Sequence, residues 1–219
     1  MKLQHRVIIL VLVLALLASA CSAATPTAGS TPTAAAQVKK PTTPSNAIPS
    51  PMPTKVVPTG LPTTPPPFSI ASLAFKNDGE IPIKHAYKMS GQCSGENLSP
   101  ALYWEGTPEG TQSFVLLMVD TDAKNFVHWV AYDIPATAVA MTEIKNGPDT
   151  GLKGVNDYDT QGYGGPCPPA GTHHYVFTLY ALDIPTLGLP AGATKTKVDA
   201  AMKDHIIAKV SLTGVYKRK

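Results

Sequence analysis

From residue 68 onward, apolar and polar side chains follow one another in short runs that are typical of β-strands. The clearest runs cover residues 70–75, 113–119, 126–134 and 174–182, and they are rich in Val, Phe, Tyr and Leu. Clusters of Gly, Pro, Asn and Asp separate them. Strands therefore follow strands, without the regular alternation with helices of an α/β fold. The pattern predicts a single, mainly β domain over 68–219, built as an antiparallel β-sandwich.

One stretch near the C-terminus has the spacing of a helix instead. Val198, Met202, His205 and Lys209 recur at intervals of three and four residues. The sequence therefore predicts a helix over 195–209, followed by a final strand over 210–216.

The first twenty residues have the pattern of an export signal. Lys2 and Arg6 precede an unbroken apolar run over 7–17, which is too short to span a bilayer as a mature helix. Small residues at 18–20 stand before Cys21, and this arrangement is similar to a lipobox. The similarity implies cleavage before Cys21 and attachment of lipid to it. Ordinary cleavage with a secreted product and an uncleaved anchor are the alternatives.

Residues 21–67 differ from the domain in composition. Residues 22–67 contain 12 Pro and 10 Thr, with no aromatic and no acidic side chain. Such a segment has too little apolar surface to offset its ordering entropy, so we expect a disordered tether. With lipid on Cys21, the domain would be held at the outer face of the membrane or in the cell envelope.

The net charge of +3 describes the N-terminal segments rather than the domain. Five of the 18 Lys and Arg residues precede residue 68, whereas all 15 Asp and Glu residues follow it, so residues 68–219 carry a net charge of −2. We therefore expect no nucleic-acid partner. Beyond the signal, Arg218 is the only arginine, which argues against a clamp for phosphopeptides.

The chain has three cysteines, one in the N-terminal segments and two in the predicted domain. If Cys21 carries lipid, Cys93 and Cys167 remain as an even pair in an oxidising compartment, and we expect a disulfide between them. Two buried free thiols are the alternative. Neither residue has a second cysteine at C-x-x-C spacing, so a metal site is poorly supported.

Chemistry-bearing residues gather in two stretches. The first runs from Asp120 to Trp129 (DTDAKNFVHW), and the second is the loop and strand 162–180 (GYGGPCPPAGTHHYVFTLY). Together with the motifs at 75–82 (FKNDGEIP), 93–100 (CSGENLSP), 102–104 (LYW) and 110–114 (GTQSF), they resemble the phosphatidylethanolamine-binding protein family, in its bacterial Raf-kinase-inhibitor-like branch. The resemblance implies two antiparallel sheets in a Greek-key arrangement with peripheral helices, and no cofactor.

The resemblance also implies an anion pocket. Asp120, His128, His173 and Tyr175 match the pocket residues of the family and Asp122 supports them, while Gly165 and Cys167 match its backbone wall. An aspartate beside an imidazole fixes the tautomer and favours the charged form that a phosphate needs. This chain has Thr121 and Lys124 where the family usually has prolines.

Strand geometry assigns these side chains to faces, because residues two apart share a face. It places His173 with Tyr175 and His174 opposite. It also places His128 with Val130 and Tyr132, and Trp129 opposite. We interpret His85, His174 and His205 as surface or structural residues, whereas Phe126 is either a pocket wall or a core residue.

Three functions are compatible with the residues. The first is a binding module for a small anionic ligand such as a phospholipid headgroup, without catalysis. The second is a protein-interaction role in the cell envelope, like that of a kinase or protease inhibitor. The third is a hydrolase, which is disfavoured because the sequence has no H-E-x-x-H, G-x-S-x-G or P-loop motif.

Overall fold

The computed structural model describes residues 64–218. The predicted signal, Cys21 and nearly all of the predicted tether lie outside the described residues, so those expectations stay predictions. Within residues 64–218, no helix combines the length and apolar character needed to cross a membrane.

The described chain is mainly β, as predicted, with one α-helix and one short 3₁₀ helix. The long strands are β6 (Ser113–Asp120), β7 (Phe126–Pro135), β10 (Thr172–Leu182) and β11 (Ile206–Lys217). The short ones are β1 (Ser69–Ser72), β2 (Gly79–Glu80), β3 (Lys88–Met89), β4 (Cys93–Ser94), β5 (Leu102–Glu105), β8 (Ala140–Met141) and β9 (Leu152–Lys153). The helices are η1 (Ile83–His85) and α1 (Lys195–Met202).

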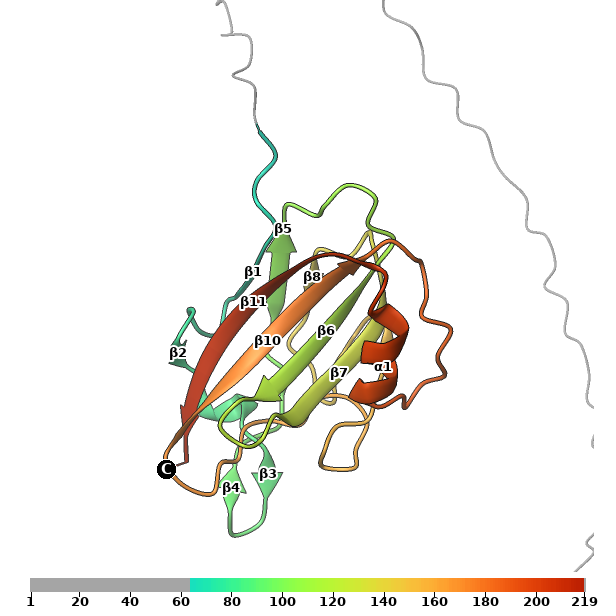
Figure 1. Ribbon diagram of the computed structural model, residues 1–219. Coiled ribbons are helices and arrows are strands. Elements are labelled where there is room, and N and C mark those ends of the chain that lie inside the picture. Colours follow the sequence, from blue (N-terminus) through green and yellow to red (C-terminus); the bar gives the residue numbers. More distant parts are fainter. Residues whose placement is uncertain (1–63, 219) are drawn as a thin grey trace, which may run out of the picture. The chain divides into compact units, whose positions relative to one another are not determined.

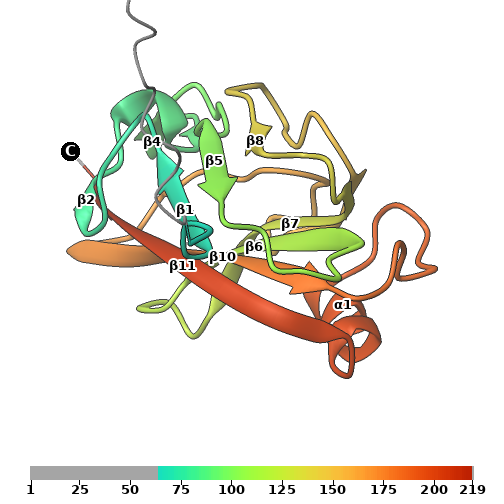
Figure 2. The ribbon, with the colours of Figure 1, turned by 90° about the horizontal axis from the view of Figure 1, so that it is seen from above.

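Two sheets form the sandwich, with a small hairpin beside them. The large sheet has the order β2-β11-β10-β6-β7-β9, the small sheet has the order β1-β5-β8, and β3 pairs only with β4. Among the strands of the described residues, all pairings are antiparallel except that of β11 with the two-residue β2. Figures 1 and 2 show the small sheet over one face of the large sheet and α1 on the other.

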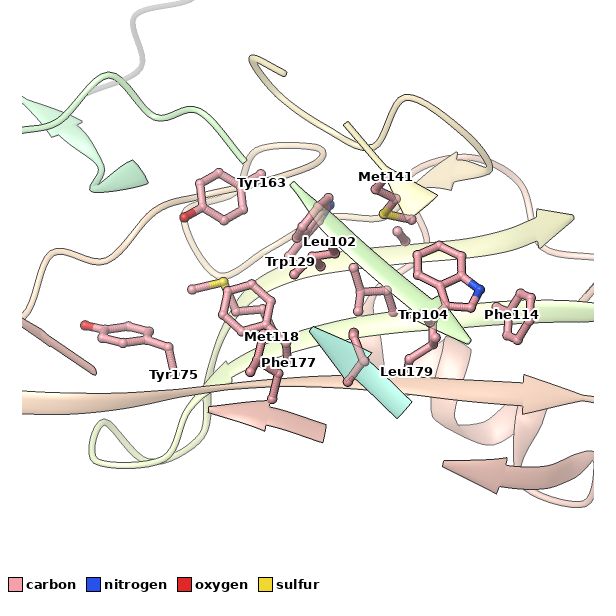
Figure 3. Packing of buried hydrophobic residues seen from close by; sticks show 14 of the residues in the cluster. Leu102, Trp104, Phe114, Met118, Trp129, Met141, Tyr163, Tyr175, Phe177 and Leu179 are labelled. Atoms are coloured by element: carbon pink, nitrogen blue, oxygen red, sulfur yellow. The ribbon is translucent and has the colours of Figure 1, made fainter. Parts of the chain in front are cut away.

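Two apolar clusters hold these layers together. The main cluster lies between the sheets and includes Trp104, Phe114, Trp129 and Phe177 (Figure 3). The second packs α1, through Val198 and Met202, against the other face of β6 and β7. Figure 3 shows Tyr163 and Tyr175 at one end of the main cluster, and Trp104 and Phe114 at the other.

The prediction of a helix over 195–209 was wrong in its second half. The helix ends at Met202, and Ile206 already pairs with Leu182 as the first residue of β11. Ile206 and Ile207 are β-branched, and β10 pairs with eleven of the twelve residues of β11. Tertiary pairing therefore outweighs the helical spacing of a few side chains.

Candidate functional site

A pocket of about 160 Å³ opens at the end of the large sheet where β6 stops and β7 and β10 begin. Its lining combines one carboxylate, one imidazole and an aromatic wall. The lining residues are Asp120, Ala123, Phe126, His128, Tyr158, Cys167, Pro168, Pro169 and Tyr175. Of the predicted site residues, Asp120, His128, Cys167 and Tyr175 thus come together, and Phe126 is a pocket wall.

A bulge in β7 turns His128 into this pocket. Val119 pairs with Val127 and Met118 pairs with Trp129, so His128 is an extra residue between two paired positions. The prediction that His128 shares a face with Val130 and lies opposite Trp129 was therefore wrong. Trp129 belongs to the main cluster, and the ring of His128 lies 5.1 Å from that of Tyr175 in the same cluster. Strict alternation fails because the bulge shifts the side-chain period by one residue.

The two ring nitrogens of His128 have different surroundings. Nδ1 donates a hydrogen bond to the carbonyl of Gly164 at 2.7 Å, which leaves Nε2 as the nitrogen available to a ligand. The side chain is buried. Burial lowers the pKa of His128, although the Gly164 carbonyl and the charge of Asp120 act in the opposite direction. The neutral ring, with Nε2 as an acceptor, is therefore the form favoured near neutral pH.

The carboxylate of Asp120 accepts two hydrogen bonds, one from the turn that follows it and one from a histidine. Its Oδ1 accepts a hydrogen bond from the backbone N–H of Asp122 at 2.9 Å, and its Oδ2 accepts one from Nδ1 of His173 at 2.7 Å. The aspartate side chain is 4% exposed and the histidine side chain 12% exposed. The first bond is of the kind that aspartate forms in turns, so the side chain of Asp120 stabilises the turn that follows it. His173 contacts Asp120 but does not line the pocket.

Asp122 forms a second, exposed pair beside the first. Its Oδ2 accepts hydrogen bonds from the backbone N–H and from Nδ1 of His174, at 2.7 and 2.9 Å. These two bonds lower the pKa of Asp122. His173 and His174 thus lie on opposite faces of β10, as predicted. Asp122 fastens the β6–β7 turn to β10, and it is not part of the pocket lining.

Tyr175 places a hydroxyl at the buried end of the pocket. The residue is fully buried, and its hydroxyl makes no hydrogen bond of ordinary geometry to another residue of 64–218. Burial raises its pKa, and the charge of Asp120 raises it further. The hydroxyl lies within reach of the carboxylate of Asp120 inside the pocket, so this group is a candidate ligand contact.

Cys167 ties the wall of the pocket to the β3–β4 hairpin. It forms the predicted disulfide with Cys93, 74 residues away in the sequence. The wall that follows includes Pro168 and Pro169, which have no backbone N–H. The side chain of Arg218 donates a hydrogen bond to the carbonyl of Pro169 at 2.7 Å.

Gly165 lies behind this wall rather than in it. Its N–H donates to Oδ1 of Asn97 at 2.7 Å, and a Cβ at this position would lie 2.1 Å from the carbonyl oxygen of His85. The glycine is therefore required for close packing of two backbone segments, and its N–H is already occupied.

Sequence reasoning missed Tyr158 and the residues that hold it. The ring of Tyr158 stacks on Tyr87 at 4.1 Å and meets the rings of Phe126 and His128 edge to face. The buried Asn156 supports it, because its side-chain oxygen accepts the backbone N–H groups of Tyr158 and Thr160. An Asn-Asp-Tyr-Asp sequence is a turn signal, but no local pattern points its tyrosine at a pocket.

The comparisons with known proteins agree with this fold. A model of the phosphatidylethanolamine-binding protein family matches residues 71–217. The chain belongs to the phosphatidylethanolamine-binding protein family. It is 44% identical to the UPF0098 protein of Aquifex aeolicus over 156 residues, which cover 68% of this chain and 88% of that protein. Members of this family are in general binding proteins rather than enzymes.

Two further relatives bear on the fold and on localisation. The crystal structure of Escherichia coli YbcL, described as a member of the mammalian family, superposes with a TM-score of 0.64 at 32% identity, over 69% of this chain and 99% of YbcL. A Mycobacterium tuberculosis protein named putative lipoprotein LppC is 36% identical over 68% of this chain and 72% of its own. The first relative agrees with the β-sandwich, and the name of the second agrees with a lipid-anchored family member.

Proposed function

We propose that this chain is an extracytoplasmic, membrane-tethered binding protein that takes a small phosphate-type anion, such as a phospholipid headgroup, into the Asp120–His128 pocket without chemical turnover. The tether and the anchor at Cys21 rest on the sequence pattern, and the name of the LppC relative supports them. Cys167, which lines the pocket, is held in a disulfide and is therefore unavailable as a thiolate nucleophile.

The arrangement of His128 carries this proposal. With Nδ1 committed to the carbonyl of Gly164, Nε2 is the nitrogen that a ligand can reach. A deprotonated phosphate oxygen needs a donor, so Nε2 takes up a proton when such an oxygen binds to it, and the lowered pKa of His128 makes that uptake measurable. The hydroxyl of Tyr175 supplies a second donor. A phosphate that keeps one proton can in turn donate to Asp120.

Isothermal titration of the intact, detergent-solubilised chain with inorganic phosphate tests the proposal. Titrations at pH 7 in two buffers of different ionisation enthalpy should give a net uptake of up to one proton per phosphate bound. The same titration of Asp183→Asn, which lies outside the pocket, should be unchanged. The absence of saturable binding at millimolar phosphate, or binding without proton uptake, would contradict this mechanism.

A second titration distinguishes a phospholipid headgroup from free phosphate as the ligand. Phosphorylethanolamine and inorganic phosphate share the anion but differ in the substituent, so a tighter phosphorylethanolamine complex supports a headgroup ligand. Equal affinities support free phosphate.

A further inference from the structure

His85, in η1, is a fully buried histidine whose two ring nitrogens both face oxygen acceptors. Nδ1 donates a hydrogen bond to the carbonyl oxygen of Leu98 at 2.8 Å. Nε2 makes no hydrogen bond to another residue of 64–218, and Oε2 of Glu143 lies 3.7 Å from it. With its proton on Nδ1, the neutral ring therefore directs the lone pair of Nε2 toward a carboxylate. The imidazolium, which has a donor on each nitrogen, matches both neighbours.

Glu143 is paired at the surface with the lysine that precedes His85. Its Oε2 lies 2.6 Å from Nζ of Lys84, and the two side chains are 33% and 42% exposed. Water screens an exposed ion pair of this kind, so the pair contributes little to stability. A hydrogen bond from Nε2 of His85 needs Oε2 to move closer by only about 1 Å, which a rotation of the glutamate side chain provides. The carboxylate can therefore change partners at small cost.

We propose that His85 and Glu143 form a proton-operated latch. When His85 takes up a proton from water, Oε2 of Glu143 moves from Nζ of Lys84 to Nε2 of His85 and accepts a hydrogen bond from it. When His85 releases the proton, the carboxylate returns to the ammonium. This device goes beyond the proposed function, and it does not depend on whether the pocket binds a ligand.

The latch joins two segments that are distant in the chain. Glu143 follows β8, and the carbonyl of the next residue, Ile144, accepts hydrogen bonds from the backbone N–H and the hydroxyl of Ser99. On the side of η1, the carbonyl of His85 accepts a hydrogen bond from the hydroxyl of Tyr163 at 2.8 Å. The proton on His85 therefore decides whether the segment after β8 is held to η1 by a buried group or by an exposed one.

The charged and titratable groups around His85 come from four segments. Lys84 belongs to η1 itself, Glu143 to the segment after β8, and Glu96 to the segment after β4, while Tyr163 of the segment before β10 contributes its hydroxyl. Both glutamates favour the imidazolium, whereas burial and Lys84 oppose it. Burial is the largest influence and lowers the pKa of His85, so the latch closes in acid and is open at neutral pH.

An NMR titration of the intact, detergent-solubilised chain, with its histidine rings labelled with ¹⁵N, tests the latch between pH 7.5 and 4.5. The variant His85→Gln identifies the signals of His85, whose Nε2 should change from an acceptor to a donor while the chain is still folded. Glu143→Gln removes the carboxylate charge and should move this titration to lower pH. Lys84→Gln leaves the carboxylate without its ammonium and should move it to higher pH. Glu109→Gln, a matched change between β5 and β6, should leave it in place.

Two results of this titration would overturn the inference. The first is a His85 ring that stays neutral until the chain unfolds or to pH 4.5, and the second is a titration that Glu143→Gln does not move. Either result would leave His85 as a buried structural residue.

The free energy of unfolding gives a second measurement that needs no assignment of ring signals. Glu143 stabilises the imidazolium in the folded chain, so Glu143→Gln should lose more stability than the unaltered chain when the pH falls from 7 to 5. Lys84→Gln should lose less. Denaturant unfolding at the two pH values measures these losses. A purely structural pair would lose the same amount at both, so an equal effect of Glu143→Gln at pH 7 and pH 5 would contradict the latch.

Discussion

The large sheet carries an aspartate–histidine pair near each end of β10, and the aspartate of the pair at the start of the strand lines the pocket. At the start of the strand, Asp120 and His173 are 2.7 Å apart and almost fully buried, with exposed fractions of 4% and 12%. Past its end, Asp183 and His205 are 2.9 Å apart with exposed fractions of 55% and 41%. The residue types and the distances are nearly the same, so neither explains why one end is a candidate site.

The surroundings make the difference. At the pocket end, the Cys93–Cys167 disulfide and the ring of Tyr158 enclose the carboxylate, and the bulge in β7 adds a buried imidazole. At the other end, water screens the pair, and exposed ion pairs of this kind contribute little to stability. Enclosure, rather than the presence of Asp and His, turns a structural pair into a binding site.

The largest effect is expected from the disulfide. In the double variant Cys93→Ala/Cys167→Ala, the unfolded chain regains the freedom of a 74-residue separation, which corresponds to about 4 kcal/mol in the chain-entropy model. Chemical denaturation should show this loss in the free energy of unfolding, and phosphate affinity should fall because the wall at Cys167 is released. Unchanged phosphate affinity would mean that the disulfide is not needed to hold the pocket wall at Cys167 in place.

The second largest effect is expected from a substitution of Gly165, behind the pocket, in comparison with one of Gly188, in the loop after β10. Gly165→Ala places a Cβ against the backbone of residues 85–87, and we expect a loss of about 3 kcal/mol from overpacking. Gly188→Ala meets no atom within 4 Å and suffers only from its positive φ of 67°, so about 1 kcal/mol should be lost. Thermal and denaturant unfolding of the two variants should preserve this order. Equal losses would show that the loop behind the pocket is not closely packed.

The two aspartates themselves form the third comparison. Asp120→Asn removes a buried charge that accepts two hydrogen bonds, and bonds to charged groups typically contribute about 2 kcal/mol. Asp183→Asn should change the free energy of unfolding by about 0.5 kcal/mol, because its pair is exposed. Denaturation curves at pH 7 measure both. A larger loss in Asp183→Asn would reverse the argument from burial.

The smallest effect is a dependence of stability on pH that arises at the pocket end. Burial lowers the folded-state pKa of His128 and also that of His85, so below about pH 6.5 the unfolded chain binds protons that the folded chain does not. Stability should therefore fall as the pH falls below 6.5, by at most about 1.4 kcal/mol per pH unit for each histidine. His128→Gln should reduce the slope. A slope that His128→Gln does not alter would place the titrating group elsewhere.

Local patterns were sufficient for much of the fold. The four long apolar runs became β1, β6, β7 and β10, because their alternation and β-branched content favour strands on a half-buried sheet. The faces of His173 and His174 followed from the two-residue period in a regular strand. Local patterns could not predict where α1 ends, since Ile206 joins β11 only because it pairs with β10.

For the candidate site too, the sequence predicted one part and the tertiary structure decided the rest. Its residue types, Asp120, His128, Cys167 and Tyr175, were identified from the sequence, largely through motifs that the chain shares with its family. The sequence did not indicate that the N–H of Gly165 is occupied by Asn97, or that Asp122 fastens a turn instead of lining the pocket. Those outcomes depend on partners that are distant in the chain.

By itself, the sequence of this protein predicted a β-sandwich domain from its side-chain periodicity, and its family and the groups available for binding from motifs that resemble that family. Only the tertiary structure decided that His128 lies on the same face as Trp129, that Tyr158 lines the pocket and that His128 is buried enough for its pKa to fall. The physical reason is that one extra residue in β7 reverses a side-chain face, and that burial arises from contacts between segments rather than within them.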